Sequence, residues 1–229
     1  IGTIWLVGVL TITIFVGIFM YYVNKTMKGS IEVPMSEYKP AVSTEMYYDK
    51  NAGTGENEDW YMYQTLYYEQ NRIWVDLGQI PDYLQQAAIA IEDKRFESHH
   101  GVDWYGTMSA IVRTLNGGSM QGGSTLKPQT SKNITGDNQD NVKRKIMEIY
   151  RALALEKEYS KDDILEVYLN TIYLGEMCYG VQTASQAYFG KDAADLTLAE
   201  SACLIGITNN PSMYDPLLSD WTRANNRDR

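Results

Sequence analysis

An uninterrupted apolar run opens the chain. Residues 1–23 contain no charged side chain, and a helix of that length spans roughly 34 Å, enough for the hydrocarbon core of a bilayer at about 30 Å. Tyr21 and Tyr22 occupy interfacial positions at its end. A signal peptide and a buried core helix are the alternatives, but no small-residue cleavage site follows the run. The pattern therefore predicts a transmembrane helix over residues 1–23.

The charges beside this helix bear on its orientation. Lys25 and Lys28 follow the apolar run, and by the positive-inside tendency they favour a cytoplasmic position for the rest of the chain. Because the chain begins with Ile rather than Met, we expect residues before Ile1. The orientation would then depend on their charges as well as on Lys25 and Lys28.

Polar and β-prone residues fill the next segment. Residues 24–44 form a polar connector that contains proline, and residues 45–69 are acidic and rich in Tyr. Partial strand-like alternation over residues 61–67 and a β-prone run over residues 72–75 predict two short strands. Residues 24–75 are therefore expected to join the membrane helix to the main domain.

From residue 81 onward, the apolar positions follow helical spacing. The first stripe recurs at i, i+3, i+4 and i+7, in Leu84, Ala87, Ala88 and Ile91. Later stripes consist of Ile146, Ile149, Leu153 and Ala154, and of Ile164, Leu165, Tyr168 and Leu169. Ser160 and Thr197 are expected to be helix N-caps, each followed by an acidic first turn. The pattern predicts a mainly α-helical domain over residues 76–229, interrupted by a Gly-rich loop at residues 116–125.

Charge and composition narrow the class of function. The chain of 229 residues carries 20 Lys and Arg against 29 Asp and Glu, a net charge of −9. Such an acidic chain lacks the basic surface that nucleic-acid binding needs, so we expect no nucleic-acid partner. Two Cys and two His, without a C-x-x-C motif, argue against a disulfide scaffold and a Cys/His zinc site.

Two groups of residues could carry chemistry. Glu92 lies near Ile89, Ile91 and Phe96, and a carboxylate among apolar side chains is desolvated and accepts a proton more readily. The alternative is a surface Glu in an ion pair. Residues 143–145 form a basic cluster after the Gly-rich loop, which suits a phosphate ligand. The alternative is a solvated helix face with an Arg144–Glu148 pair.

Together these segments resemble the peptidoglycan glycosyltransferases of glycosyltransferase family 51. Glu92-Asp-Lys-Arg-Phe96-Glu-Ser-His99-His-Gly101 is similar to the family's first motif, E-D-x-x-F-x-x-H-x-G. Gly122-Gly-Ser-Thr125 with Gln129 and Lys132 resembles the second, and Arg144-Lys-Ile-Met-Glu148 resembles R-K-x-x-E. Lys161-Asp-Asp-Ile164-Leu-Glu-Val-Tyr168-Leu-Asn170 resembles K-x-x-I-L-E-x-Y-L-N. Order and spacing agree from about residue 81 to 216.

The resemblance implies a lysozyme-like, mostly helical domain that polymerises lipid II into β-1,4-linked glycan and releases undecaprenyl pyrophosphate. It makes Glu92 the general base and Glu148 a second essential carboxylate, near the pyrophosphate and a divalent cation, Mg or Mn, that Glu148 would bind. The implied substrate-binding residues are Asp93, Phe96, His99, Gly123, Ser124, Thr125, Gln129, Lys132, Arg144, Lys145 and Asn170. The implied partners are lipid II, the growing glycan strand, the membrane and a cell-wall synthesis complex.

The resemblance also implies a location. The family is anchored in the cell membrane by a single helix, with the catalytic domain on the extracellular or periplasmic face. Two other functions stay open at this point. A lysozyme-like fold also suits a glycan hydrolase, which uses a Glu with a second carboxylate, and a degenerate domain would act as a non-catalytic scaffold.

One pair of residues departs from the family pattern. Lys127-Pro128 stands where the family usually has Thr and often Gln or Met. Proline fixes φ at about −65° and disfavours helical geometry at the preceding residue. We therefore expect the helix to begin at or after Pro128. Lys127 would then lie at the helix entrance and add positive charge beside the pyrophosphate.

Overall fold

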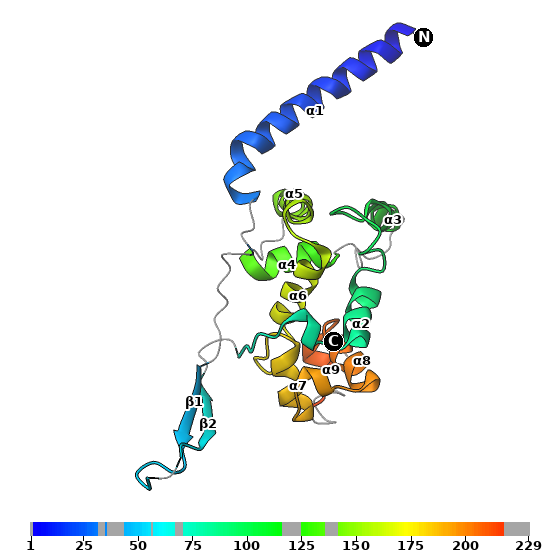
Figure 1. Cartoon of the computed structure of the whole chain (residues 1–229). Helices are drawn as coiled ribbons and strands as arrows, with labels where there is room; N and C mark the ends of the chain where they lie inside the picture. The colour runs from blue at the N-terminus through cyan, green and yellow to red at the C-terminus, as the bar shows by residue number, and fades with distance from the viewer. Residues whose placement is uncertain are drawn as a thin grey trace.

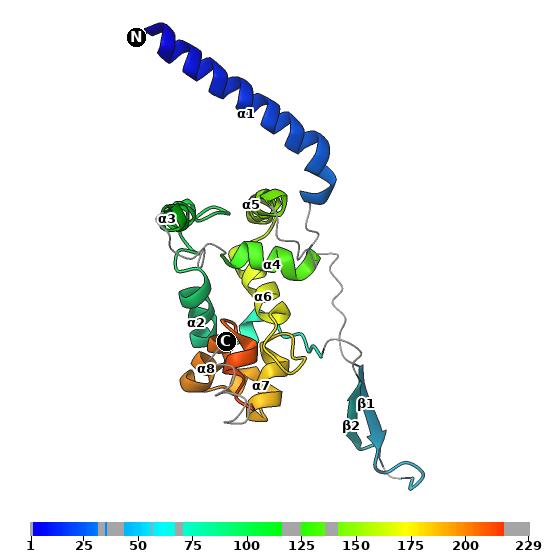
Figure 2. The same ribbon diagram turned by 180° about the vertical axis from the view of Figure 1, so that it is seen from behind.

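Helices make up most of the described chain, as the sequence predicts. The structure is a computed structural model that describes residues 2–31, 35, 44–55, 57–66, 71–115, 125–135 and 142–217. In chain order the elements are α1 (Gly2–Ile31), β1 (Thr44–Asp49), β2 (Trp60–Leu66), η2 (Leu77–Gln79), α2 (Asp82–Glu92), α3 (Trp104–Leu115), α4 (Leu126–Thr135), α5 (Val142–Glu158), α6 (Lys161–Thr171), α7 (Val181–Phe189), η3 (Ala193–Asp195), α8 (Leu198–Ile207) and α9 (Pro211–Tyr214). Figures 1 and 2 show α1 extending away from the body that α2 to α9 form.

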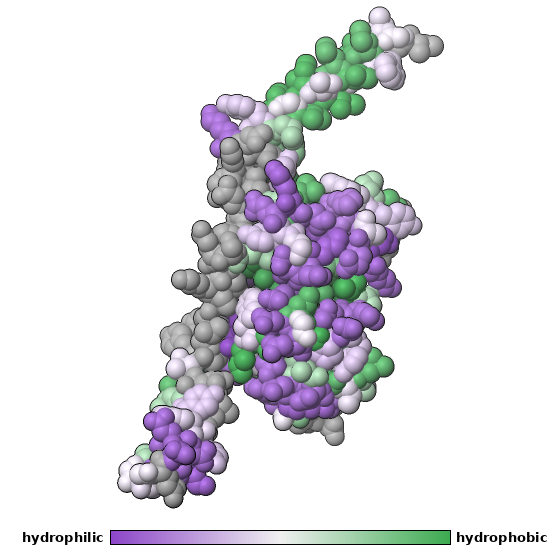
Figure 3. Space-filling model, viewed as in Figure 1, coloured by the Kyte–Doolittle hydropathy of each residue, from purple (hydrophilic) through white to green (hydrophobic). Residues whose placement is uncertain are grey.

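The apolar helix α1 is exposed over residues 2–22. Its span Gly2–Tyr22 is long and apolar enough to cross a membrane, and none of it is buried in the protein. Figure 3 shows that most of the residues along this span are hydrophobic. The helix continues to Ile31, beyond the predicted end at Val23. Near the body α1 packs against α5, where Tyr150 Oη lies 3.4 Å from Met20 Sδ.

A short antiparallel hairpin precedes the helical body. β1 pairs with β2, and the register shifts between Met46 and Tyr47. The strand predicted at residues 61–67 is confirmed by β2, but the strand predicted at residues 72–75 is wrong. That segment is extended beside the helices, with an isolated bridge at Asn71. Val75 N donates to Asn170 Oδ1, and Asn170 Nδ2 donates to Val75 O. Pairing depends on a partner strand, which alternation within one segment does not identify.

The core is formed mainly by α2, α6, α7 and α8. In α6 every side chain from Val167 to Thr171 is buried, as are Ile164 and Leu165. The N-caps predicted at Ser160 and Thr197 are confirmed, each with a complete capping box. Two predicted core positions are wrong, because Ile91 is 53% exposed and Leu153 is 39% exposed. In α5 the buried stripe runs instead through Met147, Ala152 and Leu155.

A strained turn leads from α6 to α7. Met177 has a φ of +60°, in the left-handed region, which costs a residue with a Cβ roughly 1–2 kcal/mol. Its side chain is 45% exposed, so little packing would be lost on removal. Glycine relieves this strain but adds about 0.5–1 kcal/mol of conformational entropy to the unfolded chain.

We expect Met177→Gly to raise the free energy of unfolding by about 0.5–1 kcal/mol. Met177→Ala is the matched control, because it removes the side chain and keeps the strain. The comparison is made by urea denaturation of all three proteins in one detergent. Equal stabilisation by both substitutions would mean that the side chain, and not the backbone, carries the strain.

Candidate active site

Three helices meet at the carboxylate of Glu92. This residue ends α2, and its Oε2 accepts a hydrogen bond of 2.6 Å from Gln129 Nε2 on α4. Its Oε1 accepts one of 2.8 Å from the Thr208 hydroxyl, at the end of α8. The packing of α2 against α8 and of α4 against α5 and α6 fixes both donors (Figure 2). The carboxylate is thus held in one orientation while remaining partly exposed.

The surroundings of this carboxylate differ from the predicted apolar setting. Ile91 faces outward and Phe96 is fully buried in the core, and the Glu92 carboxylate accepts hydrogen bonds from Gln129 and Thr208. Tyr168 of α6 lies close as well. Burial raises the pKa of Tyr168 well above its ordinary value, and the charge of Glu92 raises it further. Sequence reasoning missed Thr208 as a neighbour, since 116 positions separate it from Glu92 and no motif links them.

Contacts between its own residues stabilise the turn after α2. Asp93 is 3% exposed, and its two carboxylate oxygens lie 3.1 and 2.9 Å from His99 Nε2. Gly101 closes the turn with a φ of +86°, and a Cβ there would lie 2.9 Å from Leu153 Cδ2 on α5. The histidine and the glycine of this motif therefore shape the turn that follows Glu92.

Several residues that were expected to bind substrate are buried or hydrogen-bonded within the protein. Phe96 and Asn170 are fully buried. The Asn170 amide accepts from Val75 N and donates to Val75 O and Glu166 O. Because these side chains have no free polar group or surface toward solvent, they support the fold in this structure, and their contact with substrate stays a prediction. The same holds for Asp93, whose carboxylate lies against His99.

Other expected site residues lie on α4 and α5. Gln129 touches Glu92, Lys132 is exposed on the same helix, and Thr125 directly precedes it. Gly123 and Ser124 lie outside the described residues. Arg144 and Lys145 belong to the start of α5, but their side chains lie outside the described part. Glu148 follows one turn later and is 5% exposed.

The predicted start of this helix and the predicted direction of the Lys127 side chain are wrong. Helix α4 begins at Leu126, so Pro128 lies within its first turn, where a missing N–H does little harm. The Lys127 side chain is fully buried, with its Nζ 2.7 Å from Glu156 Oε2. Burial lowers the pKa of Lys127, and the hydrogen bond to Glu156 opposes this effect only in part. Lys127 therefore points into the protein and not toward a ligand at the helix entrance.

The cation expected at Glu148 would have few protein ligands among the described residues. Among the residues that the structure describes, no group of three His, Cys, Asp or Glu side chains could hold a metal ion by itself. Mg²⁺ commonly binds one or two carboxylates together with substrate phosphates and water. A cation at Glu148, which is 5% exposed, would therefore take most of its ligands from substrate phosphates and water.

Comparison with known proteins places the chain in a family. Residues 59–229 match the sequence model of the family described as Transglycosylase. Penicillin-binding protein 1F of Bacillus subtilis (strain 168) is 43% identical over 162 residues, covering 70% of this chain and 23% of that protein. Penicillin-binding protein 1A of Neisseria lactamica is 45% identical over 155 residues, covering 67% of this chain and 19% of that protein.

A crystal structure was matched as well. Penicillin-binding protein 1A from Haemophilus influenzae aligns over 73% of this chain and 15% of that chain, with a TM-score of 0.35 and 24% identity. The chain spans about a fifth of the length of the curated relatives that it matches. Because the family's sequence model covers most of the chain, including Glu92, Gln129 and Glu148, the protein belongs to the transglycosylase family.

Proposed function

We propose that this protein is a membrane-anchored peptidoglycan glycosyltransferase that polymerises lipid II into β-1,4-linked glycan strands. The observation that carries the proposal is the carboxylate of Glu92, held by Gln129 and Thr208 where α2, α4 and α8 meet. Membership of the transglycosylase family supports the same reaction class. The related proteins are named for penicillin binding, and the site of this chain carries the proposed reaction.

Glu92 acts in this proposal as the general base. It accepts the proton of the acceptor's 4-hydroxyl as that oxygen attacks the anomeric carbon of the donor, and the bond to pyrophosphate breaks with inversion. A positioned base contributes roughly 10²–10⁴-fold to such a reaction. The donors Gln129 and Thr208 hold the carboxylate in the orientation that proton transfer needs.

The leaving group requires positive charge rather than an acid. Pyrophosphate departs as an anion, and cationic groups stabilise the charge that develops on it. Lys132 on α4 and the basic start of α5 are the residues that we assign to this task. A divalent cation, when bound, would neutralise part of the same charge, and Glu148 is the carboxylate that would hold it.

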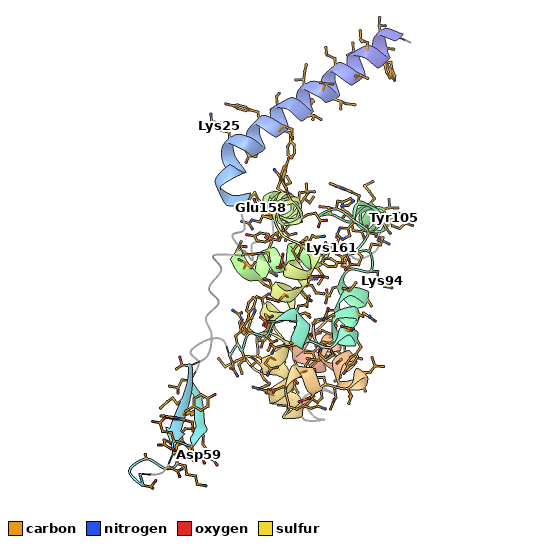
Figure 4. All side chains as sticks on the ribbon, viewed as in Figure 1. Lys25, Asp59, Lys94, Tyr105, Glu158 and Lys161 are labelled. Carbon is orange, nitrogen blue, oxygen red and sulfur yellow. The ribbon has the colours of Figure 1, made fainter. Side chains whose placement is uncertain are left out.

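Two features support a position at the membrane. The exposed apolar span of α1 serves as a single-pass anchor. Helix α3 also exposes Trp104, Tyr105, Met108 and Val112, and it lies on the side of the body from which α1 extends (Figure 4). A lipid-linked substrate suits such a setting, with the body on the extracellular or periplasmic face. That position stays a proposal, since Lys25 and Lys28 on their own favour the opposite orientation.

One experiment separates the proposed function from its alternatives. The purified protein in detergent is incubated with lipid II and Mg²⁺, and glycan polymer is measured. A parallel reaction tests cleavage of preformed glycan. We expect polymer and no cleavage. Cleavage without polymer would indicate a hydrolase, and the absence of both reactions would indicate a non-catalytic scaffold.

Arg144→Ala and Lys145→Ala test the assignment of the pyrophosphate side. Each change removes one cation from the start of α5 in a chain of net charge −9. Because a hydrogen bond to a charged group contributes about 1.5–3 kcal/mol, we expect the KM for the donor to rise more than that for the acceptor. A phosphoglycolipid inhibitor should also bind each variant less tightly. Unchanged inhibitor affinity in both variants would place the pyrophosphate elsewhere.

A further inference from the structure

A buried lysine lies beside the site without a part in the proposed reaction. The Lys127 ammonium group is 2.7 Å from Glu156 Oε2 and 4.6 Å from the centroid of the Phe96 ring. No part of the side chain is exposed. Burying an ion pair is costly, and replacing one with apolar side chains often leaves stability unchanged or improves it. Stability alone is therefore a weak reason for a lysine at this position.

Lys127 is also not needed to neutralise Glu156. Lys161, at the start of α6, places its Nζ 3.4 Å from Glu156 Oε1 and 5.0 Å from the Phe96 ring centroid (Figure 4). The same Nζ donates to the carbonyl oxygens of Phe96 and His99, at 2.6 and 3.0 Å. Glu156 thus retains a cationic partner without Lys127.

The position of Lys127 on α4 gives it a geometric effect. Gln129, two residues later on the same helix, donates to Glu92. Phe96, which the Lys127 ammonium group contacts, follows Glu92 by four residues and is fully buried. Helix α4 is therefore joined to the segment 92–96 at two points. Packing against α5 and α6 holds the body of α4, and the contact of Lys127 with Phe96 ties the first turn of α4 to the segment that carries Glu92.

We infer that Lys127 is a positioning residue for Glu92. Its buried ammonium group, held by Glu156 and the Phe96 ring, fixes the start of α4 so that the Gln129 amide stays within hydrogen-bond distance of the Glu92 carboxylate. The inference rests on the proposed function for its catalytic consequence. Active-site groups must be held within a fraction of an ångström of their productive geometry, and a displacement of about 1 Å can lower a rate by up to 10²-fold.

The test compares Lys127→Met with the parent and with Lys157→Met. Met matches the length of the Lys stem, and Lys157 is an exposed lysine of the same charge directly after Glu156. Initial rates of lipid II polymerisation give kcat and KM, and a thermal melt gives stability. For Lys127→Met we expect kcat to fall about tenfold, with KM and the melting temperature close to the parent's. Lys157→Met should change none of these quantities.

Several outcomes would overturn the inference. A stable Lys127→Met variant with the parent's kcat would remove the positioning role. Parallel losses of kcat and melting temperature would indicate a structural role instead. If Lys127→Met does not fold, Lys127→Gln, which keeps a hydrogen-bond donor for Glu156, takes its place in the same assays.

Hydrogen exchange makes the test independent of activity. We expect the backbone amides of α4, residues 126–135, to exchange at least threefold faster in Lys127→Met than in Lys157→Met. Unchanged exchange would contradict the inference even if the parent proves inactive. A parent that makes no polymer would count against the proposed function alone, while faster exchange in the variant would still support the positioning of α4 by Lys127.

Discussion

Glu92→Gln should abolish polymerisation while leaving the fold intact. Glutamine keeps the size and shape of glutamate, its oxygen can still accept from Gln129, and its amide can donate to the Thr208 hydroxyl. Only the capacity to take up a proton is lost. We expect the rate of lipid II polymerisation to fall by roughly 10²–10⁴-fold, with lipid II binding and thermal stability close to the parent's.

Glu97→Gln is the matched control for this change. Glu97 is an exposed carboxylate in the turn that follows Glu92, and it makes no contact with the site among the described residues. Both variants are assayed at the same pH with a binding measurement alongside. A polymerisation rate for Glu92→Gln near that of Glu97→Gln would exclude Glu92 as the base.

Gly101→Ala should strongly destabilise the protein. At a φ of +86° the new Cβ would lie 2.9 Å from Leu153 Cδ2 and 3.1 Å from Leu153 Cα. Left-handed backbone strain of about 1–3 kcal/mol would add to overpacking of about 1–3 kcal/mol against α5. We expect a loss of about 3 kcal/mol in the free energy of unfolding. Activity should fall too, because the turn after Glu92 would move away from α5.

Gly190→Ala separates the two contributions to this loss. Gly190 also has a positive φ, of +66°, but nothing lies within 4 Å of its potential Cβ. It should therefore lose only the backbone part, about 1–2 kcal/mol. Denaturant unfolding of the three proteins in one detergent measures both losses. Equal losses for Gly101→Ala and Gly190→Ala would show that the contact with α5 is unimportant.

Local patterns in the sequence predicted most of the elements. The uncharged run of residues 1–23 predicts an apolar helix, because the hydrophobicity of a segment does not depend on distant contacts. The sequence also predicts the N-caps at Ser160 and Thr197, because all residues of a capping box lie within four consecutive positions. The sequence assigns Glu92 and Gln129 to one site because both belong to motifs that agree with the family in order and spacing.

Long-range packing decided the rest of the site. The hydroxyl of Thr208 reaches Glu92 only because α8 packs against α2, which no local pattern encodes. The direction of Lys127 could not be read from its neighbours either. An exposed lysine at a helix entrance is the usual expectation, but Glu156 and Phe96 come from two other segments and together hold the ammonium group inside. The role of Asn170 depends on long-range packing too, because the backbone of Val75 passes beside α6 and hydrogen-bonds to the Asn170 side-chain amide. The sequence by itself thus determined the elements and the residues that carry the chemistry. Only tertiary structure decided which of those side chains meet, since burial and hydrogen bonding depend on segments that are distant in the chain.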